Sequence, residues 1–260
     1  MSRLAVWPRE KGSRSVFGGL GSPGSSLAVG IAVAVALAIP VLAQAPAAGR
    51  GVTAPDGTFD VIWKGAAQIE KRHTSVCGTL TETRVSPLLA RPLVLRGTFC
   101  LAGTDRFRLD YTEPEAVRII YSAGTLSVTT DGGRTTEAFD VGTAVKRTRD
   151  YFGGPGAKRN LEHDFSIQAA QTPEKYTLVL SAAAGRIARS VSRIAVDLEK
   201  TGFLPTRLEI RGKSGVTSTF DIRVTALDGA IDPGRFVAPK PTPKPGRGGQ
   251  APQPGRPAKF

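Results

Sequence analysis

The chain has 260 residues, of which 40% are hydrophobic and 22% are charged, and its formal net charge at pH 7 is +13. Three of these charges lie within the first 26 residues and five within residues 239–260, which leaves a body of charge +5. A body this mildly basic does not favour a nucleic-acid-binding protein, and two cysteines without a nearby pair of histidines do not indicate a metal site.

The amino terminus carries the pattern of an export signal. Residues 27–43 (LAVGIAVAVALAIPVLA) are uncharged and apolar, and four basic residues precede them. Pro40 breaks the helix, and Ala43 supplies the small residue required before a cleavage point. We expect residues 1–43 to be a signal peptide cleaved after Ala43, followed by a flexible leader over residues 44–57. An uncleaved anchor is the alternative, because 17 residues is the lower limit for a membrane span.

The body, residues 58–238, has the length of one domain and begins with a predicted helix. Apolar residues recur there at three- and four-residue spacing along one face: Phe59, Ile62, Trp63, Ala66 and Ile69. Asp56 or Thr58 can cap the start of this helix. After Arg72 the apolar period changes to two. The alternation predicts strands over residues 76–85, 92–101, 106–111, 117–122 and 125–130, closed by a turn at residues 131–133.

A helical insert is expected next. Apolar residues among charges over residues 137–152 are followed by Gly153-Gly154-Pro155-Gly156, a helix stop, and residues 157–162 can add a short helical turn. Strand periodicity resumes over residues 165–169, 175–180, 191–198, 205–211 and 217–226, with a last turn at residues 232–236. Residues 239–260 are nearly all Pro, Gly and basic residues, which predicts a disordered tail.

Splitting the strands by parity separates an apolar face from a polar face. The apolar face collects Leu80, Leu95, Phe99, Leu101, Phe107, Leu109, Tyr111, Ile119, Tyr121, Leu178, Leu180, Ile194, Val196, Leu208, Ile210, Phe220, Ile222 and Val224. The polar face carries Thr79, Thr81, Thr83, Arg96, Thr98, Arg106, Arg108, Asp110, Arg207, Glu209, Asp221 and Arg223. Alternation of this kind predicts a half-buried antiparallel sheet. We therefore expect a mostly β, α+β fold: an open, strongly curved half barrel of about ten strands with a helical lid.

The two cysteines bear on strand pairing. If residues 87–90 form a hairpin loop, the register places Cys77 opposite Cys100, at a separation that suits a disulfide in an exported protein. Two free thiols are the alternative.

Candidate catalytic groups are few. His163 lies between Glu162 and Asp164, a run that usually marks a solvated loop, and His73 is the one other histidine. The sequence has no Gly-x-Ser-x-Gly elbow, and residues 153–158 lack the spacing of a phosphate-binding loop. Asp105, Asp110 and Glu113 alternate outward, which disfavours a glycosidase-like carboxylate pair. The chain is therefore not predicted to be an enzyme, and no cofactor is expected.

The order and spacing of several short motifs resemble the LolA family of periplasmic outer-membrane lipoprotein carriers. The motifs are Leu80-Thr81-Glu82, Gly97, Arg106-Phe107-Arg108-Leu109, Thr112-Glu113-Pro114, Gly124-Thr125-Leu126, the late hairpin Lys200–Pro205 and the closing residues 220–239. The resemblance spans nearly the whole body. Where the family often has a basic residue followed by proline, this chain has Gly103-Thr104, which leaves open how a lid would be held.

The resemblance implies a monomeric periplasmic carrier whose apolar cavity binds the acyl chains of lipoproteins or related lipids. Its partners would be an inner-membrane lipoprotein-releasing transporter and an outer-membrane acceptor. The cavity wall would be the apolar face above, without Val196, Ile210 and Val224. The alternatives are a lipoprotein-sensing module, and a structural envelope protein whose apolar face is plain core. The sequence does not identify the cargo or the role of the basic tail.

Overall fold

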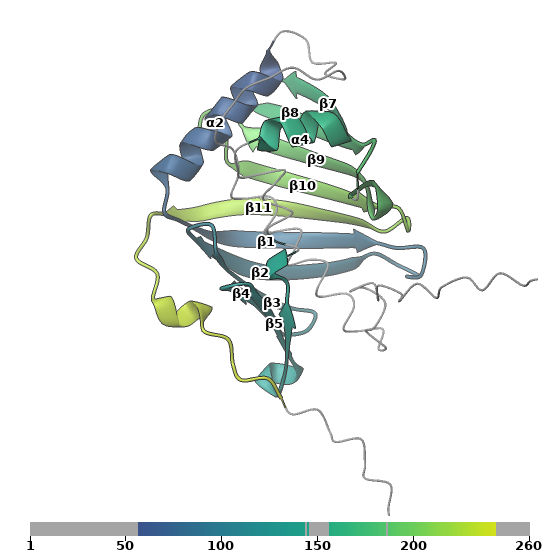
Figure 1. The fold of residues 1–260 in the computed structure, drawn as a ribbon. Coiled ribbons are helices and arrows are strands. Elements are labelled where there is room, and N and C mark those ends of the chain that lie inside the picture. Colours follow the sequence, from purple (N-terminus) through teal and green to yellow (C-terminus); the bar gives the residue numbers. More distant parts are fainter. Residues whose placement is uncertain (1–56, 144, 146–155, 186, 243–260) are drawn as a thin grey trace, which may run out of the picture.

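The computed structural model of the chain describes residues 57–143, 145, 156–185 and 187–242 (Figure 1). The predicted signal peptide, nearly all of the predicted leader, and the tail beyond residue 242 lie outside these residues. Within the described part, no helix is both long and apolar enough to cross a membrane.

The described domain is one antiparallel sheet with helices at one end. Helix α2 spans Thr58–Arg72 and α4 spans Ala157–Asp164. The strands are β1 (Ser75–Val85), β2 (Leu93–Ala102), β3 (Arg106–Glu113), β4 (Val117–Ser122), β5 (Thr125–Thr130), β6 (Thr135–Asp140), β7 (Phe165–Gln171), β8 (Lys175–Ala182), β9 (Val191–Glu199), β10 (Pro205–Gly212) and β11 (Thr217–Leu227). Short 3-10 turns lie at Asp131–Gly133 (η1), Ile187–Arg189 (η2) and Pro233–Phe236 (η3).

All eleven strands belong to a single open sheet in the order β6-β5-β4-β3-β2-β1-β11-β10-β9-β8-β7. Consecutive strands pair with one another except β6 and β7, which form the two edges of the sheet. The first and last strands of the domain, β1 and β11, pair at its centre. Both α2 and α4 pack against β7, and Figure 1 shows the sheet curling, with both helices near its β7 end. The fold is the predicted open, curved α+β half barrel, with eleven strands in place of about ten.

The predicted helix over residues 137–152 is wrong at its start. Residues 135–140 form strand β6, which pairs with β5 in a hairpin across residues 131–133. Phe139 and Glu137 stand opposite Leu126 and Val128 of β5, so they point to the same face of the sheet, while Thr136 and Ala138 point to the other. The apolar spacing of this segment also fits a helix, which is why a helix was predicted. Residues 142, 143 and 145 are helical, and residues 144 and 146–152 lie outside the described part.

Two terminal details also differ from expectation. Helix α2 begins after Gly57, whose left-handed backbone (φ 71°) serves as N-cap without a side-chain hydrogen bond, so Thr58 is the first helical residue and not the cap. The carboxyl-terminal segment stays with the sheet beyond residue 239: the backbone N–H of Thr242 donates to the carbonyl of Thr136 at 2.9 Å. The predicted tail therefore begins at least four residues too early.

Candidate functional site

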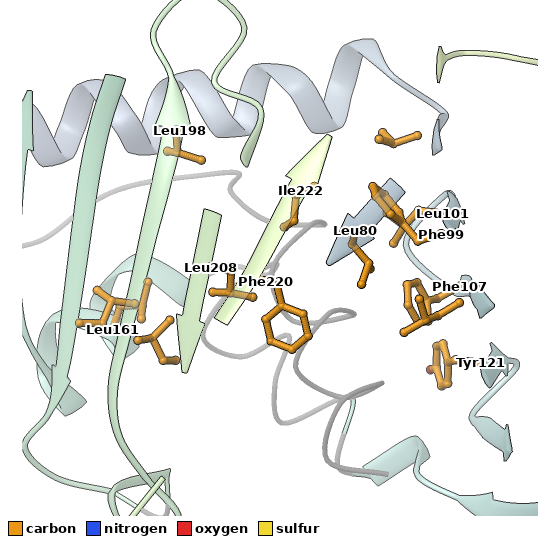
Figure 2. Close-up of a cluster of buried hydrophobic side chains, with 14 of the residues drawn as sticks. Leu80, Phe99, Leu101, Phe107, Tyr121, Leu161, Leu198, Leu208, Phe220 and Ile222 are labelled. Atoms are coloured by element: carbon orange, nitrogen blue, oxygen red, sulfur yellow. The ribbon is translucent and has the colours of Figure 1, made fainter. Parts of the chain in front are cut away.

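The fifteen residues predicted to line a cavity all lie on one face of the sheet, which we call the inner face because α2 and α4 lie over it. Register alone aligns them: Phe99 stands opposite Leu109, and Leu109 stands opposite Ile119. They pack in one cluster with Phe59 of α2 and Leu161 of α4 (Figure 2). All are buried except Leu178, which is partly exposed.

Glycines shape this face at the centre of the sheet. Gly78 pairs with Phe99, and Gly97 pairs with Tyr111. A Cβ at Gly78 would come within 2.8 Å of the Phe99 ring, and one at Gly97 would meet the backbone carbonyl of Asp110. Gly78 thus leaves room for the Phe99 ring, and Gly97 allows the backbone of β3 to approach closely.

The cover of the inner face thins towards β8–β11. There, four apolar side chains that point the same way as the buried cluster remain partly exposed: Leu178, Val196, Ile210 and Val224. We call these four the open strip. Leu178 pairs with Val196, and Ile210 lies diagonally across from Val196 on the next strand, since the direct partner of Val196 there is Leu208. Val224 lies apart from these three, towards the end of β11, where it pairs with Gly78. Partly exposed apolar side chains also occur in the other half of the sheet, at Leu93, Val117 and Phe139, so the open strip is one of several places where the inner face has apolar surface to spare.

A buried polar centre interrupts the inner face, and the sequence analysis did not single it out. Glu82 is completely buried, and Arg84 is 5% exposed. Arg84 Nη2 donates to Glu82 Oε1 at 2.6 Å, and the Tyr111 hydroxyl donates to Glu82 Oε2 at 2.6 Å. Burial, followed by the charge of Glu82, raises the pKa of Tyr111 far above its usual range. Glu82 and Arg84 share the parity of Leu80, so strand alternation was the signal that could have located them.

A second polar atom under the helices has no partner. The indole Nε1 of Trp63, on α2, is buried without a hydrogen bond, and the residue is only 4% exposed. Its ring lies 5.9 Å from that of Phe59, at an interplanar angle of 58°.

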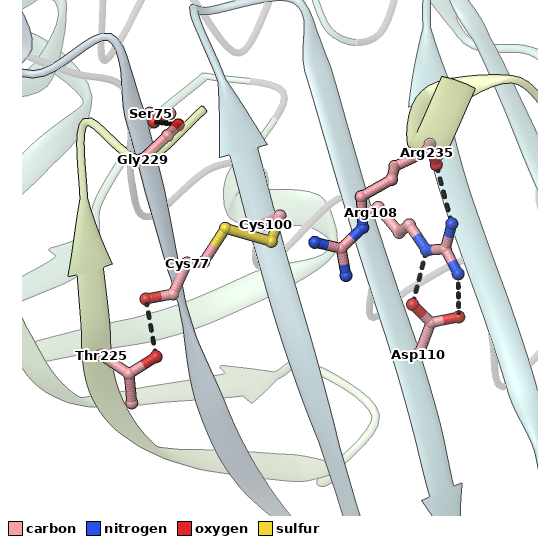
Figure 3. Close-up of a disulfide and its surroundings, with 8 residues drawn as sticks. All are labelled: Ser75, Cys77, Cys100, Arg108, Asp110, Thr225, Gly229 and Arg235. Atoms are coloured by element: carbon pink, nitrogen blue, oxygen red, sulfur yellow. Dashed lines mark hydrogen bonds and ion pairs between the residues drawn. A yellow bond between two sulfur atoms is a disulfide. The ribbon is translucent and has the colours of Figure 1, made fainter. Parts of the chain in front are cut away.

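Residues 228–242, which we call the strap, cross the opposite, outer face of β1–β6, where they contact β3, β4 and β6. Cys77 and Cys100 stand opposite one another, as the predicted register requires, and are joined in a disulfide with a Cα–Cα distance of 4.1 Å (Figure 3). Phe236 of the strap, 3% exposed, packs in a small cluster with this disulfide. Arg108 Nη1 donates to the carbonyl of Arg235 at 3.0 Å and so ties the strap to β3.

Asp110, one of the carboxylates considered for catalysis, lies on this outer face between two arginines. Arg108 Nη2 donates to Asp110 Oδ1 at 3.1 Å, and Arg118 Nε donates to the same oxygen at 2.7 Å. Burial acts to raise the pKa of Asp110, but these hydrogen bonds and charges outweigh burial and hold the pKa below its usual value. A carboxylate held ionised in this way forms a structural ion pair and does not suit the role of a general acid.

The remaining candidates are likewise occupied by surface contacts. His73 Nδ1 lies 2.6 Å from Asp228 Oδ2, which lowers the pKa of Asp228. His163 is 78% exposed and contacts its neighbour Asp164. Among the described residues, no group of three or more His, Cys, Asp or Glu side chains could hold a metal ion.

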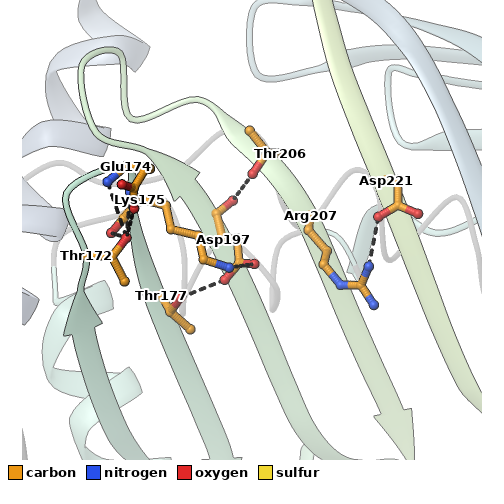
Figure 4. A network of polar contacts seen from close by, with 8 residues as sticks. All are labelled: Thr172, Glu174, Lys175, Thr177, Asp197, Thr206, Arg207 and Asp221. Carbon is orange, nitrogen blue, oxygen red and sulfur yellow. Dashed lines mark hydrogen bonds and ion pairs between the residues drawn. The ribbon is translucent and has the colours of Figure 1, made fainter.

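The outer face of β8–β11 is polar and open. Figure 4 shows Lys175 Nζ paired with Asp197 Oδ2 at 2.7 Å, while the Thr177 hydroxyl donates to the other oxygen of that carboxylate at 2.7 Å. Arg207 and Asp221 pair across β10 and β11 at 3.0 Å, with both side chains about half exposed. Exposed pairs of this kind add little to stability.

Comparisons with known proteins bear on the fold. No protein-family model matches the chain, and no curated protein matches it. A LolA superfamily protein from Nitrosomonas europaea is 14% identical with a TM-score of 0.35, and the match covers 69% of this chain and 97% of that one. The lipoprotein LppX of Mycobacterium tuberculosis is 11% identical with a TM-score of 0.43, covering 68% of this chain and 98% of that one.

The complex of MucA and MucB from Pseudomonas aeruginosa contains a further match. It is 12% identical with a TM-score of 0.47, and the match covers 71% of this chain but only 62% of that chain. Each of the three matches is less than 15% identical to this chain and has a TM-score below 0.5.

Proposed function

We propose that this protein is a periplasmic carrier that binds the acyl chains of lipoproteins, or of related lipids, in an apolar cavity against the inner face and shuttles them from the inner to the outer membrane. One observation carries the proposal: the inner face is apolar from β1 to β11, yet its cover leaves the open strip of Leu178, Val196, Ile210 and Val224 partly exposed. A hydrocarbon chain is the ligand that such a surface binds best.

The energetics suit a carrier. Each methylene moved from water to an apolar surface contributes about 0.8 kcal/mol, so one acyl chain of ordinary length offsets much of the loss of its bilayer contacts. No bond is made or broken in such a transfer. The protein needs a cover over the inner face whose open and closed arrangements differ by only a few kcal/mol. Helix α2, which packs on the edge strand β7, is the element placed to provide it.

The proposed carrier function implies a donor and an acceptor of lipoproteins. We propose export by the predicted signal peptide, loading by an inner-membrane lipoprotein-releasing transporter, and delivery to an outer-membrane acceptor. The protein would act as a monomer without a cofactor.

A second candidate is an envelope protein whose inner face is plain core. The burial of all the predicted residues but Leu178 favours it. The open strip distinguishes the two candidates. Its side chains are partly exposed without a ligand and contribute less to the stability of the core, so a substitution there can test lipid binding without unfolding the protein.

The test is release of lipoproteins from spheroplasts. Protein purified after export is added, and acylated lipoproteins in the supernatant are quantified; a carrier releases them saturably and in a stoichiometric amount. Leu178→Glu should abolish release while the protein stays folded. Val179→Glu is the matched control, because Val179 is the next residue on β8 and points to the outer face. No release by folded wild-type protein would contradict the proposal, and unfolding of Leu178→Glu alone would favour the plain-core candidate.

A further inference from the structure

The buried indole of Trp63 raises a question that packing does not answer. Trp63 belongs to the buried cluster of the inner face, where its neighbours on α2 are Phe59 and Ile62. Its Nε1–H is a donor with no acceptor within reach among the described residues. Tryptophan can only donate through this atom, and a buried donor left unpaired costs about 1–3 kcal/mol. A phenylalanine would cover the same apolar surface without that cost.

An acceptor for this donor has to be brought by another molecule. The acceptor oxygens of the polar centre are already used, since Glu82 receives Arg84 on one oxygen and Tyr111 on the other. Trp63 is 4% exposed and lies among the apolar side chains of the buried cluster, so a molecule that reaches it has to be mainly apolar. An oxygen acceptor attached to a hydrocarbon chain meets both conditions.

The charges around α2 narrow the class of ligand further. Lys158 of α4 approaches the Phe59 ring at 5.6 Å, but its ammonium is held by Asp60 at 2.5 Å and by Glu162 at 3.5 Å. Arg84 is paired with Glu82. Burying an ionised carboxylate without a cation of its own is very costly. A neutral carbonyl therefore suits this position better than the carboxylate of a free fatty acid.

We infer that the Trp63 Nε1–H is the docking point for the carbonyl oxygen of an ester- or amide-linked acyl chain, whose hydrocarbon lies against the inner face. The inference rests on the proposed carrier function and deepens it: the ligand is recognised at the acyl linkage as well as along the chain. Helix α2 packs on β7, which adjoins β8 and the open strip, so the donor lies at the end of the sheet where apolar surface is available.

The test uses two lipids that differ only in the acceptor: 1-decanoylglycerol, an ester, and 1-O-decylglycerol, an ether in which a methylene replaces the carbonyl. Dissociation constants are measured by equilibrium dialysis below the aggregation concentration of each lipid. Wild-type protein should bind the ester about tenfold more tightly than the ether, as one hydrogen bond to an otherwise unpaired donor would produce. Trp63→Phe should bind the two lipids equally, and its ether affinity should stay close to that of wild type.

Two further variants control for changes in packing around Trp63. Phe59→Leu is the matched control, since it alters the apolar cover on the same helix and should weaken both lipids alike without changing their ratio. Benzothienylalanine at position 63 replaces the N–H by sulfur in a ring of the same shape, and it should behave as Trp63→Phe does even if phenylalanine packs poorly.

The outcomes separate the inference from the function on which it rests. An ester-to-ether ratio that is unchanged in both position-63 variants would overturn the role of Trp63 while leaving lipid binding intact. Failure of folded wild-type protein to bind either lipid would remove the proposed function as well. A downfield shift of the Trp63 indole N–H proton resonance with the ester, and not with the ether, would support the hydrogen bond directly.

Discussion

The two halves of the sheet, β1–β6 and β7–β11, are built from the same alternating pattern but are covered differently. In the first half, the inner face carries Phe107 and Leu109 at 1% and 0% exposure, and the strap crosses the outer face, where Phe236 packs on the disulfide at 3% exposure. In the second half, the inner face keeps the partly exposed open strip, and the outer face carries exposed ion pairs such as Arg207–Asp221.

This difference indicates that the two halves of the sheet have different roles. A region whose strands are linked by a disulfide and crossed by a strap resists deformation, because any movement disrupts several contacts at once. A region without these two links, whose inner face is incompletely covered, can admit a ligand without unfolding. We therefore expect the first half to act as the scaffold and the second half to receive the acyl chain.

The largest effect on stability should come from truncating inner-face side chains, one in each half of the sheet. Phe107→Ala removes a completely buried ring from the scaffold and should lower the free energy of unfolding by about 4 kcal/mol. Leu178→Ala removes a partly exposed side chain and should cost about 1 kcal/mol, while lipid affinity falls clearly. Urea denaturation and lipid titration measure the two effects. Equal destabilisation by both substitutions would mean that the halves do not differ in packing.

A smaller effect is expected at the seam between the halves, where β1 carries the polar centre. Glu82→Leu leaves Arg84 without its carboxylate and Tyr111 without its acceptor, and should cost about 3 kcal/mol. Glu82→Leu combined with Arg84→Met should be more stable than Glu82→Leu alone, because the uncompensated charge is removed. Thermal unfolding of both variants at pH 7 provides the comparison. A double variant less stable than the single one would show that Arg84 contributes chiefly through contacts other than Glu82.

Removal of the disulfide tests whether the first half of the sheet can be destabilised without loss of lipid binding. Cys77 and Cys100 are 23 residues apart, so Cys77→Ala with Cys100→Ala should reduce stability by about 2–3 kcal/mol through the freer unfolded chain. Lipid binding should be retained, because the bridge lies on the outer face of the first half. Wild-type protein treated with a reductant serves as the control and should match the double variant. Loss of lipid binding at full stability would contradict the assignment of roles.

Much of this fold could be predicted from the sequence, because strand periodicity and turn residues are local signals. Strands at residues 117–122 and 125–130 match the structure to the residue, since alternation on both sides flanks the turn residue Gly124. Strand β6 was missed because the four-residue spacing of Val141 and Val145 fits a helix, although the two-residue spacing of Phe139 and Val141 fits a strand. Residues 239–242 of the strap were assigned to a disordered tail because of their Pro-rich composition, and the hydrogen bond between Thr136 and Thr242 shows that they pair with β6.

The candidate site shows the same limit. Parity placed all fifteen apolar residues on the inner face, and the same parity could have placed Glu82 and Arg84 there. The contact from the Tyr111 hydroxyl could not be predicted, because it depends on the register of β1, β2 and β3 together. The Trp63 indole is unpaired because no acceptor from another described part of the chain lies within hydrogen-bond distance. No local sequence pattern indicates such an absence.

The smallest effect concerns the pH dependence of the strap. Because the pKa of Asp110 is lower in the folded protein than its usual value, this carboxylate contributes stability that is present above about pH 4 and is lost as the pH falls through the folded pKa. Asp110→Asn should therefore flatten the fall in unfolding free energy between pH 5 and pH 2.5, by about 1 kcal/mol or less for a pair open to solvent.

Asp105→Asn is the control for this effect, because Asp105 is 64% exposed and lies 3.7 Å from Arg106. Since Arg108 holds both Asp110 and the carbonyl of Arg235, acidification should loosen the strap before it unfolds the sheet. The protection factors of the amides of residues 235 and 237, which correct for the intrinsic pH dependence of exchange, should then fall below pH 4 in wild-type protein, and to a smaller extent in Asp110→Asn, where the carboxylate is already absent. Exchange at these amides that follows global unfolding in both proteins would show that the strap and the scaffold form a single cooperative unit.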